Sequence, residues 1–235
     1  MNKRILLLLS LFITVFATAQ NKKITLEESV LQQNRLFRAD RLAGFQWIPS
    51  TTKYTYYVEN GTKLMLANAT DAKPSLVLSL EDLNKSLGTK MNSFFGYQWK
   101  NENTLTISNG AKFYSYDVLS KIGKTVQETP ASAENQTFDK ANENLAFTEN
   151  NNLFFFNKNK EKITVTNNSD KNIVSGQTIS RSEFGISGGI FWSPKATYLA
   201  FYQKDETNVA DYPLLDITET PGKLENIKYP MIGQN

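Results

Sequence analysis

The sequence has 235 residues and contains no histidine and no cysteine. Ser-His-Asp and Cys-His catalysis, histidine- or thiolate-bound metal sites and disulfide bonds are therefore excluded within these residues. The formal net charge is +3, from 26 Lys and Arg against 23 Asp and Glu, and this balance does not indicate a nucleic-acid-binding protein. We expect no catalytic residue, no cofactor and no metal in this chain.

Residues 1–19 are predicted to be a secretory signal peptide. Lys3 and Arg4 precede an apolar run from Ile5 to Phe16, and Ala17-Thr18-Ala19 follows as a small-residue cleavage site. An uncleaved membrane anchor is the alternative, but the run is shorter than the roughly 20 residues needed to span a bilayer. We therefore expect cleavage after Ala19 and a mature protein that is secreted or periplasmic and makes no membrane contact.

Two short helices are predicted in a chain that otherwise has a β pattern. Thr25-Leu26-Glu27-Glu28 matches a capping box, which predicts a helix from there to about Gln33. The run from Ser79 to Leu83 indicates a second helix that ends near Gly88.

The β pattern occurs four times along the chain. In each unit an aromatic anchor stands several residues before a strand-like run, and in the first three units a turn and a partner strand follow. The anchors are Trp47, Trp99, Phe138 and Trp192. The runs are Tyr54 to Val58, Leu105 to Ile107, Leu145 to Phe147 and Leu199 to Phe201. The turns are Glu59-Asn60-Gly61, Asn109-Gly110 and Asn150-Asn151-Asn152, and Asn-Gly is a strong hairpin signal.

The spacing of the anchors matches the length of a propeller blade. Successive anchors are 52, 39 and 54 residues apart, and a blade of four antiparallel strands takes roughly 40–50 residues. A plain β-sandwich is the alternative. We predict an all-β fold, a partial β-propeller of repeated antiparallel blades with a short N-terminal helix.

The chain stops at Asn235 without a capping element after the fourth repeat. Four units are at the low end for a closed propeller, and an open stack leaves sheet faces and edges uncovered. We therefore expect that these residues are part of a longer protein.

One segment has the residue spacing of a serine-hydrolase motif but lacks the other features that the motif requires. Gly185-Ile186-Ser187-Gly188-Gly189 satisfies G-x-S-x-G, the nucleophile elbow of α/β-hydrolases. That mechanism needs a histidine base and a strand-to-helix turn, and here the residues Phe191-Trp192-Ser193-Pro194 follow instead of a helix. We interpret the motif as a glycine-rich loop.

Among the acidic residues, Glu183 is the one candidate for recognition. Glu81-Asp82 and Asp205-Glu206 lack a third ligand at a metal-site spacing, so we expect solvated surface charges there. Glu183 stands just before an aromatic-rich strand unit, and an acid on a loop beside a rigid sheet suits binding of a cationic group such as a free amine. An ordinary exposed surface acid is the alternative.

The surrounding residues resemble the dipeptidyl peptidase IV and prolyl tripeptidyl peptidase family. The resemblance covers Ser180 to Ile186, Gly189 to Pro194, Leu199 to Tyr202, Asp211-Tyr212-Pro213-Leu214 and Tyr229-Pro230-Met231, in the same order. It is specific over about a fifth of the chain and extends more weakly through the repeats. It implies an N-terminal β-propeller, covering residues 20–235 here in part, followed by an α/β-hydrolase domain that these residues do not contain.

The resemblance also implies a role for Glu183. In this family, acidic side chains of the propeller bind the free N-terminal ammonium of a peptide substrate, and Glu183 occupies the position of such an acid. Dipeptidyl enzymes typically have two adjacent glutamates there, whereas this chain has Arg181-Ser182 before a single Glu183. A single acid is more similar to the tripeptidyl branch, and Arg181 either contacts substrate or pairs with Glu183, so the length of the released peptide stays open.

Our hypothesis is that this chain is the N-terminal part of a secreted serine exopeptidase that releases di- or tripeptides from peptide N-termini. Its partners would be peptides with a free N-terminus and the α/β-hydrolase domain of the full-length protein. The alternative is a non-catalytic periplasmic propeller-like protein for binding or assembly, which would need no triad.

Overall fold

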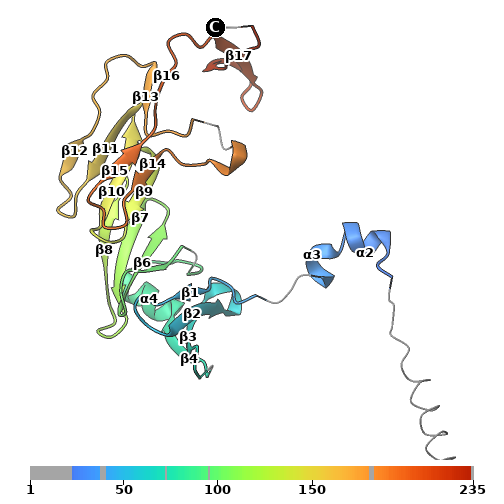
Figure 1. Ribbon diagram of the computed structural model, residues 1–235, viewed down its shortest axis with the longest axis vertical. Coiled ribbons are helices and arrows are strands. Elements are labelled where there is room, and N and C mark those ends of the chain that lie inside the picture. Colours follow the sequence, from blue (N-terminus) through green and yellow to red (C-terminus); the bar gives the residue numbers. More distant parts are fainter. Residues whose placement is uncertain (1–22, 38–40, 72, 95, 180–182, 234–235) are drawn as a thin grey trace, which may run out of the picture. The chain divides into compact units, whose positions relative to one another are not determined.

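The computed structural model describes residues 23–37, 41–71, 73–94, 96–179 and 183–233 (Figure 1). The chain forms two units, residues 1–41 and residues 42–235. The predicted signal peptide, residues 1–19, lies outside the described residues. Within the described residues, no helix is both long and apolar enough to span a bilayer.

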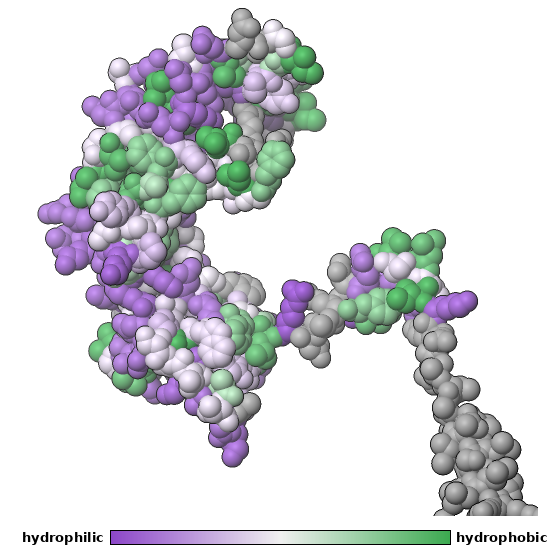
Figure 2. Space-filling view, in the orientation of Figure 1, coloured by the Kyte–Doolittle hydropathy of each residue, from purple (hydrophilic) through white to green (hydrophobic). Residues whose placement is uncertain are grey.

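The described residues of the first unit form two short helices, α2 (Leu26–Val30) and α3 (Gln33–Leu36). The predicted capping box is present, because Thr25 Oγ1 accepts a hydrogen bond from Glu28 N and Glu28 Oε2 accepts one from Thr25 N. The single helix expected up to Gln33 instead ends at Val30. No residue of α2 is buried, so no tertiary packing extends it, and apolar side chains gather on the surface of this unit (Figure 2).

The described residues of the second unit form three four-stranded antiparallel sheets, which we call blades 1, 2 and 3. Within each blade the strands pair in chain order. Blade 1 consists of β1 (Gln46–Trp47), β2 (Lys53–Val58), β3 (Lys63–Asn68) and β4 (Ser75–Ser79). Blade 2 consists of β5 (Gln98–Trp99), β6 (Thr104–Asn109), β7 (Lys112–Asp117) and β8 (Ile122–Glu128). Blade 3 consists of β9 (Glu134–Asp139), β10 (Asn144–Glu149), β11 (Asn152–Phe156) and β12 (Lys162–Thr164).

The fourth unit is divided into shorter pieces. Its strands are β13 (Ile173–Ser175), β14 (Ile190–Trp192), β15 (Leu199–Phe201) and β16 (Gln203–Asp205). β14 pairs with β15 and β13 pairs with β16. A separate hairpin follows, made of β17 (Asp211–Asp216) and β18 (Lys223–Lys228).

Every predicted anchor lies on the first strand of its pair, directly opposite the start of the predicted run. The Cα partners are Trp47 and Tyr54, Trp99 and Leu105, Phe138 and Leu145, and Trp192 and Leu199. The four-fold pattern is therefore confirmed, and the fold is all-β with repeated antiparallel blades, as predicted. The sandwich alternative is wrong, because the blades are separate sheets that pack on one another in chain order.

The core lies between the blades. One apolar cluster joins blades 1 and 2 and contains Leu64, Trp99 and Leu105. A second cluster joins blades 2 and 3 through Phe113, Leu145 and Phe147, and a third joins blade 3 to the fourth unit through Ala146, Leu153 and Ile190. Side chains alternate across each strand, so blades 2 and 3 each contribute one face to each of their two neighbours.

The predicted second helix is α4 (Leu80–Leu87). Ser79 caps its start by accepting a hydrogen bond from Asp82 N, and Gly88 ends it with φ of 65°. Although α4 follows blade 1, it bonds to blade 2, since Ser86 Oγ accepts a hydrogen bond from Gly123 N at 2.8 Å and donates one to Lys121 O at 3.2 Å. A Cβ at Gly123 would lie 2.4 Å from Leu87 Cδ2, so the absence of a side chain at this position lets α4 approach β8.

Candidate functional site

The loop that carries Glu183 interrupts a strand of the fourth unit. Gly176 N donates a hydrogen bond to Tyr202 O at 2.8 Å, and Tyr202 N donates one to Gly189 O at 2.9 Å. β13 and β14 therefore pair one after the other with the segment 199–205, as two parts of one interrupted strand. The chain leaves this strand after Gly176 and rejoins it at Gly189. Residues 177–188 form the excursion, which we call the 177–188 loop.

The base of this loop is closed too tightly for any side chain. A Cβ at Gly189 would lie 2.3 Å from the carbonyl carbon of Gln177 and 2.6 Å from Gly176 O. Gly176 itself has φ of +75°, and a Cβ there would lie 2.7 Å from Thr148 Cγ2. The two glycines thus bring the ends of the loop together against blade 3.

Two side-chain hydrogen bonds hold the described parts of the loop. Thr178 Oγ1 donates to Ile186 O at 3.0 Å, which connects the two arms, and Gln177 Nε2 donates to Asn151 Oδ1 at 3.0 Å, which ties the loop to the β10–β11 turn of blade 3. That turn is itself fixed by Asn150 and Asn151, which have φ of 48° and 62°.

Glu183 begins a single turn of 3-10 helix, Glu183–Gly185. Within this turn Phe184 has φ of 55° and is 92% exposed, and Gly185 has φ of 74°. The backbone of Glu183 therefore lies on the 177–188 loop, as the sequence predicts. The Glu183 side chain and Arg181 lie outside the described residues, so the predicted pairing of Arg181 with Glu183 stays a prediction.

The strands behind the loop are supported by aromatic contacts. Trp192 Nε1 donates a hydrogen bond to Thr137 O at 3.2 Å, and its ring packs edge-on to Phe155 at 5.6 Å between centroids. Phe191 packs edge-on to Tyr202 at 5.4 Å. The strand pair at the end of the loop, β14 with β15, is therefore attached to blade 3.

The G-x-S-x-G sequence does not form a nucleophile elbow. Gly185 ends the 3-10 turn, and β14 begins at Ile190, so a strand rather than a helix follows Ser187. The interpretation of residues 185–189 as a glycine-rich loop is confirmed.

The paired acids have local structural partners. Among the described residues, no three acidic side chains gather in a way that could hold a metal ion. Asp82 accepts a hydrogen bond from Ser79 Oγ, and Glu206 pairs with Lys204 at 2.6 Å. Hydrogen bonds from Thr207 hold the pKa of Asp205 below its ordinary value.

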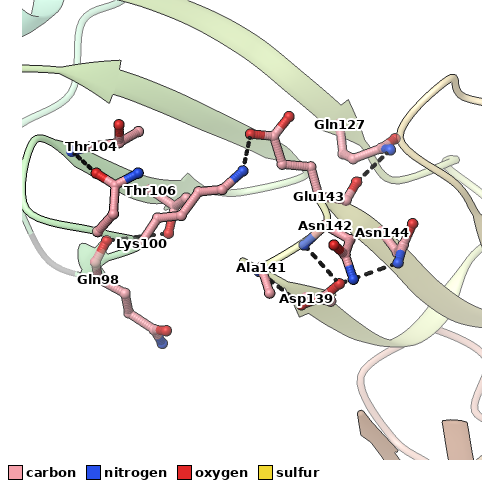
Figure 3. A network of polar contacts seen from close by, with 11 residues as sticks. Gln98, Lys100, Thr104, Thr106, Gln127, Asp139, Ala141, Asn142, Glu143 and Asn144 are labelled. Carbon is pink, nitrogen blue, oxygen red and sulfur yellow. Dashed lines mark hydrogen bonds and ion pairs between the residues drawn. The ribbon is translucent and has the colours of Figure 1, made fainter. Parts of the chain in front are cut away.

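A polar network between blades 2 and 3 was not predicted from the sequence (Figure 3). Lys100 and Glu143 form an ion pair at 2.8 Å, and Asp139 accepts hydrogen bonds from Ala141 N, Asn142 N and Asn144 Nδ2. The buried Gln127 donates from Nε2 to Glu143 O and Asn157 O. These contacts fix the β9–β10 turn against blade 2.

An open cavity of about 370 Å³ lies beside this network, and its lining includes Lys100, Asp117, Lys124 and Glu143. Lys100 and Glu143 neutralise each other. Asp117 accepts hydrogen bonds from Ser120 N, Ser120 Oγ and Leu119 N, which hold its pKa below the ordinary value. The cavity therefore carries mainly compensated charge and is a weaker candidate for ligand binding than the 177–188 loop.

Comparisons with known proteins agree with this architecture. The family model of the dipeptidyl peptidase IV (DPP IV) N-terminal region matches residues 95–235. A Bacteroides ovatus protein assigned as a dipeptidyl aminopeptidase IV is 32% identical, with a TM-score of 0.67, over 83% of this chain and 27% of its own. Dipeptidyl peptidase 4 of Porphyromonas gingivalis has a TM-score of 0.61 over 91% of this chain and 32% of its own; at 21% identity this likeness concerns the fold alone.

Curated relatives are more distant in sequence. A protein named Probable dipeptidyl-aminopeptidase B, from Pyrenophora teres f. teres, is 24% identical in an alignment of 200 residues that covers 73% of this chain and 20% of that protein. The chain thus spans about a fifth of this curated relative.

Proposed function

The chain belongs to the family of dipeptidyl peptidase IV N-terminal regions, and on that premise we propose that it supplies substrate recognition to a secreted serine exopeptidase. The proposed reaction is the release of di- or tripeptides from peptide N-termini. The observation that carries the proposal is the position of Glu183 on the loop between β13 and β14. The two ends of this loop are held close together at Gly176 and Gly189.

The chemistry of this proposal is electrostatic. A carboxylate facing a peptide ammonium forms a charge-assisted hydrogen bond, and the bond fixes how many residues extend to the cleaved peptide bond. A recognition group of this kind must keep its position relative to the reacting serine. The close approach of Gly189 to Gln177 supports such a role, because it anchors both ends of the loop to the sheet.

The serine triad would reside elsewhere in the protein. The sequence contains no histidine, so a hydrolase domain beyond these residues would supply the nucleophile and its base. The chain covers 27% of the Bacteroides ovatus structure, which leaves room for such a domain in a longer protein. The signal-like residues 1–19 support export.

The first test is to read the gene beyond the codon for Asn235. We expect an in-frame continuation that encodes a G-x-S-x-G elbow and then Asp and His in that order. A genuine stop codon would contradict the peptidase and support the non-catalytic binding protein instead.

The second test is Glu183→Gln in the full-length protein. Loss of a charged hydrogen bond costs about 1.5–3 kcal/mol, so kcat/KM for peptides with a free N-terminal amine should fall by roughly 10- to 100-fold. Reaction of the serine with a small acylating probe should not change. Glu219→Gln, at an exposed acid on the loop after β17, is the matched control, and unchanged peptide cleavage by Glu183→Gln would refute the assignment.

The role of Arg181 is tested by a double-mutant cycle with Arg181→Ala and Glu183→Gln. We propose that Arg181 contacts the substrate, so the two losses in kcat/KM should add when expressed as free energies. A large coupling term would mean instead that Arg181 acts by pairing with Glu183.

A further inference from the structure

The cavity beside the Lys100–Glu143 pair lies in the junction between blades 2 and 3. One face of blade 2 forms its floor, and Glu143 of the β9–β10 turn forms part of its wall. Farther along the same face, Phe113 packs against blade 3, so the junction is apolar at one end and polar at the other. Lys100 reaches across to Glu143 at the polar end (Figure 3).

The register of the strands places the residues of the floor side by side. Ser115 lies opposite Lys124. Asp117 lies between Thr104 and Ile122, which are its partners on the two neighbouring strands. Opposite residues share one face of a sheet, and every second residue of a strand returns to that face. The five side chains therefore share the face of blade 2 that lines the cavity.

The hydroxyl of Ser115 has unused hydrogen-bonding capacity. Ser115 is only 6% exposed, yet its side chain makes no hydrogen bond to another described residue. Buried polar groups are normally hydrogen-bonded, since an unpaired one costs free energy. Among the fully enclosed side-chain oxygens and nitrogens of the described residues, only Gln127 Oε1 lacks a partner. The Ser115 hydroxyl therefore opens onto the cavity and can bond a molecule that enters it.

Two of the four charged residues that line the cavity are not in an ion pair. Lys100 and Glu143 pair with each other, whereas Lys124 forms no ion pair or hydrogen bond with another described residue. Asp117 accepts its hydrogen bonds at Oδ1 only, so Oδ2 remains available. Those bonds lower the pKa of Asp117 and keep it negatively charged at neutral pH. Lys124 and Asp117 occupy diagonal positions on adjacent strands, yet they do not pair, and a positive and a negative group thus face the cavity separately.

We propose that this cavity binds a small zwitterion, a free amino acid or a dipeptide, with its carboxylate on Lys124 and Ser115 and its ammonium on Asp117. Charge-assisted hydrogen bonds of both signs then use the donors and the acceptor that the fold leaves free. A simple anion would meet Lys124 but be repelled by Asp117, and a simple cation the reverse. The volume of about 370 Å³ lies within the range of small-molecule sites, roughly 300–1,000 Å³.

The proposed site is separate from the 177–188 loop. Strand β10 runs from the β9–β10 turn, which carries Glu143, to the β10–β11 turn, to which Gln177 of the loop is bonded. The cavity and the base of the loop therefore lie at opposite ends of β10, a strand of six residues that spans about 17 Å. The proposal does not depend on the peptidase assignment.

Isothermal titration calorimetry of the full-length protein tests the proposal. A Glu183→Gln background removes the carboxylate that the proposed function assigns to a peptide ammonium. Alanylalanine should bind saturably in this background. Its N-acetyl form lacks the ammonium and its amide lacks the carboxylate, so each should bind roughly tenfold more weakly. Equal affinities for alanine and alanylalanine would identify a free amino acid as the ligand, and a weaker affinity for alanine would identify a dipeptide; both results support the site.

Variants of the cavity assign each contact. Asp117→Asn keeps the Oδ1 acceptor of its turn and should abolish the preference for alanylalanine over its N-acetyl form, and Lys124→Met should abolish the preference over the amide. Ser115→Ala should weaken binding severalfold without lowering Tm, because its hydroxyl has no partner in the folded protein to lose. Lys158→Met, at an exposed lysine between β11 and β12, is the matched control and should not change binding.

Three outcomes would overturn the proposal. The first is the absence of saturable binding at millimolar alanylalanine, and the second is an equal affinity for alanylalanine, its N-acetyl form and its amide. The third is binding that wild type shows and Glu183→Gln loses, which would place the ligand at the 177–188 loop and support the recognition role of Glu183 instead. The failure of this site is thereby distinguished from a failure of the proposed function.

Discussion

In blades 1 to 3 each strand pairs with the strand that precedes it in the chain, whereas in the fourth unit the first strand comes in two pieces, β13 and β14, separated by the 177–188 loop. Blades 2 and 3 bury both faces against neighbours, whereas the face of blade 1 that carries Trp47 is exposed. The fourth unit keeps the aromatic anchor Trp192 and its junction to blade 3, yet gives up strand continuity. A repeat can therefore carry a long loop where one strand is interrupted, while its aromatic junction to the preceding blade is kept.

The largest expected effect compares equivalent core positions in the two regions. Phe147 in blade 3 and Phe201 in the fourth unit occupy the same place in the pattern, but Phe147 is fully buried and Phe201 is half-buried. Phe147→Ala should lower the free energy of unfolding by about 3–5 kcal/mol, and Phe201→Ala by roughly half as much, since less apolar area is lost. Urea denaturation followed by circular dichroism measures both, and equal losses would contradict the comparison.

A second comparison concerns the indole hydrogen bonds. Trp99→Phe removes a buried bond to Thr55 and leaves a small cavity, so we expect a loss of about 2–3 kcal/mol in the free energy of unfolding. Trp192→Phe should cost less, about 1 kcal/mol, because its environment is half-buried. Trp47→Phe, at an exposed tryptophan, serves as the reference with little change. A similar cost at all three positions would contradict the prediction, because burial of the indole and its hydrogen bond would then not determine the loss.

The closure of the loop can be tested with adjacent glycines. A Cβ at Gly189 would overlap backbone atoms of Gln177, whereas a Cβ at Gly188 would lie at an ordinary 3.6 Å from Phe191 Cε1. Gly189→Ala should cost about 1–3 kcal/mol and speed hydrogen exchange in residues 177–188. Gly188→Ala should do neither. If both variants behave alike, the loop is not held at Gly189.

The smallest expected effect is a pH dependence of the stability that Glu149 contributes in blade 3. Hydrogen bonds from Lys162 and Ser132 hold the pKa of the Glu149 carboxyl below its ordinary value of 4.5. A carboxyl with a lowered pKa in the folded state stabilises the fold above its unfolded pKa, and this contribution is lost as pH falls through the folded pKa. Thermal melts should therefore show that Glu149→Gln differs most from wild type at neutral pH and that the difference narrows below about pH 4.5. A difference that persists unchanged at low pH would argue against this origin.

Much of the fold could be predicted because it follows from local signals. The anchors, the runs and the Asn-rich turns each depend on residues within ten positions of one another, and the capping residues Ser79 and Gly88 delimit α4 closely. The N-terminal helix was predicted too long, since its capping box fixes only where it starts. β13 could not be predicted, because three residues give no periodicity and the partner β16 lies about thirty residues further along the chain.

The candidate site was predicted only in part. The sequence predicts a loop at Glu183 and the structure has one there, but the closure of this loop by Gly176 and Gly189 depends on contacts between segments that the sequence does not place together. The Lys100–Glu143 pair joins residues 43 positions apart, and no spacing rule marks it. The turn residue Asp139 was a usable signal, since Asx side chains commonly bond the backbone two or three residues on, as Asp139 does with Ala141 N and Asn142 N.

Helix α4 has a consequence for how this molecule opens. A row of repeats that touch only their immediate neighbours through apolar faces is able to loosen one repeat at a time. Ser86 bonds both Lys121 O and Gly123 N, so the last strand of blade 2 is tied to the segment that leaves blade 1. In native-state hydrogen exchange the amides of β4 and β8 should then share one opening free energy, which makes the first two blades a single foldon.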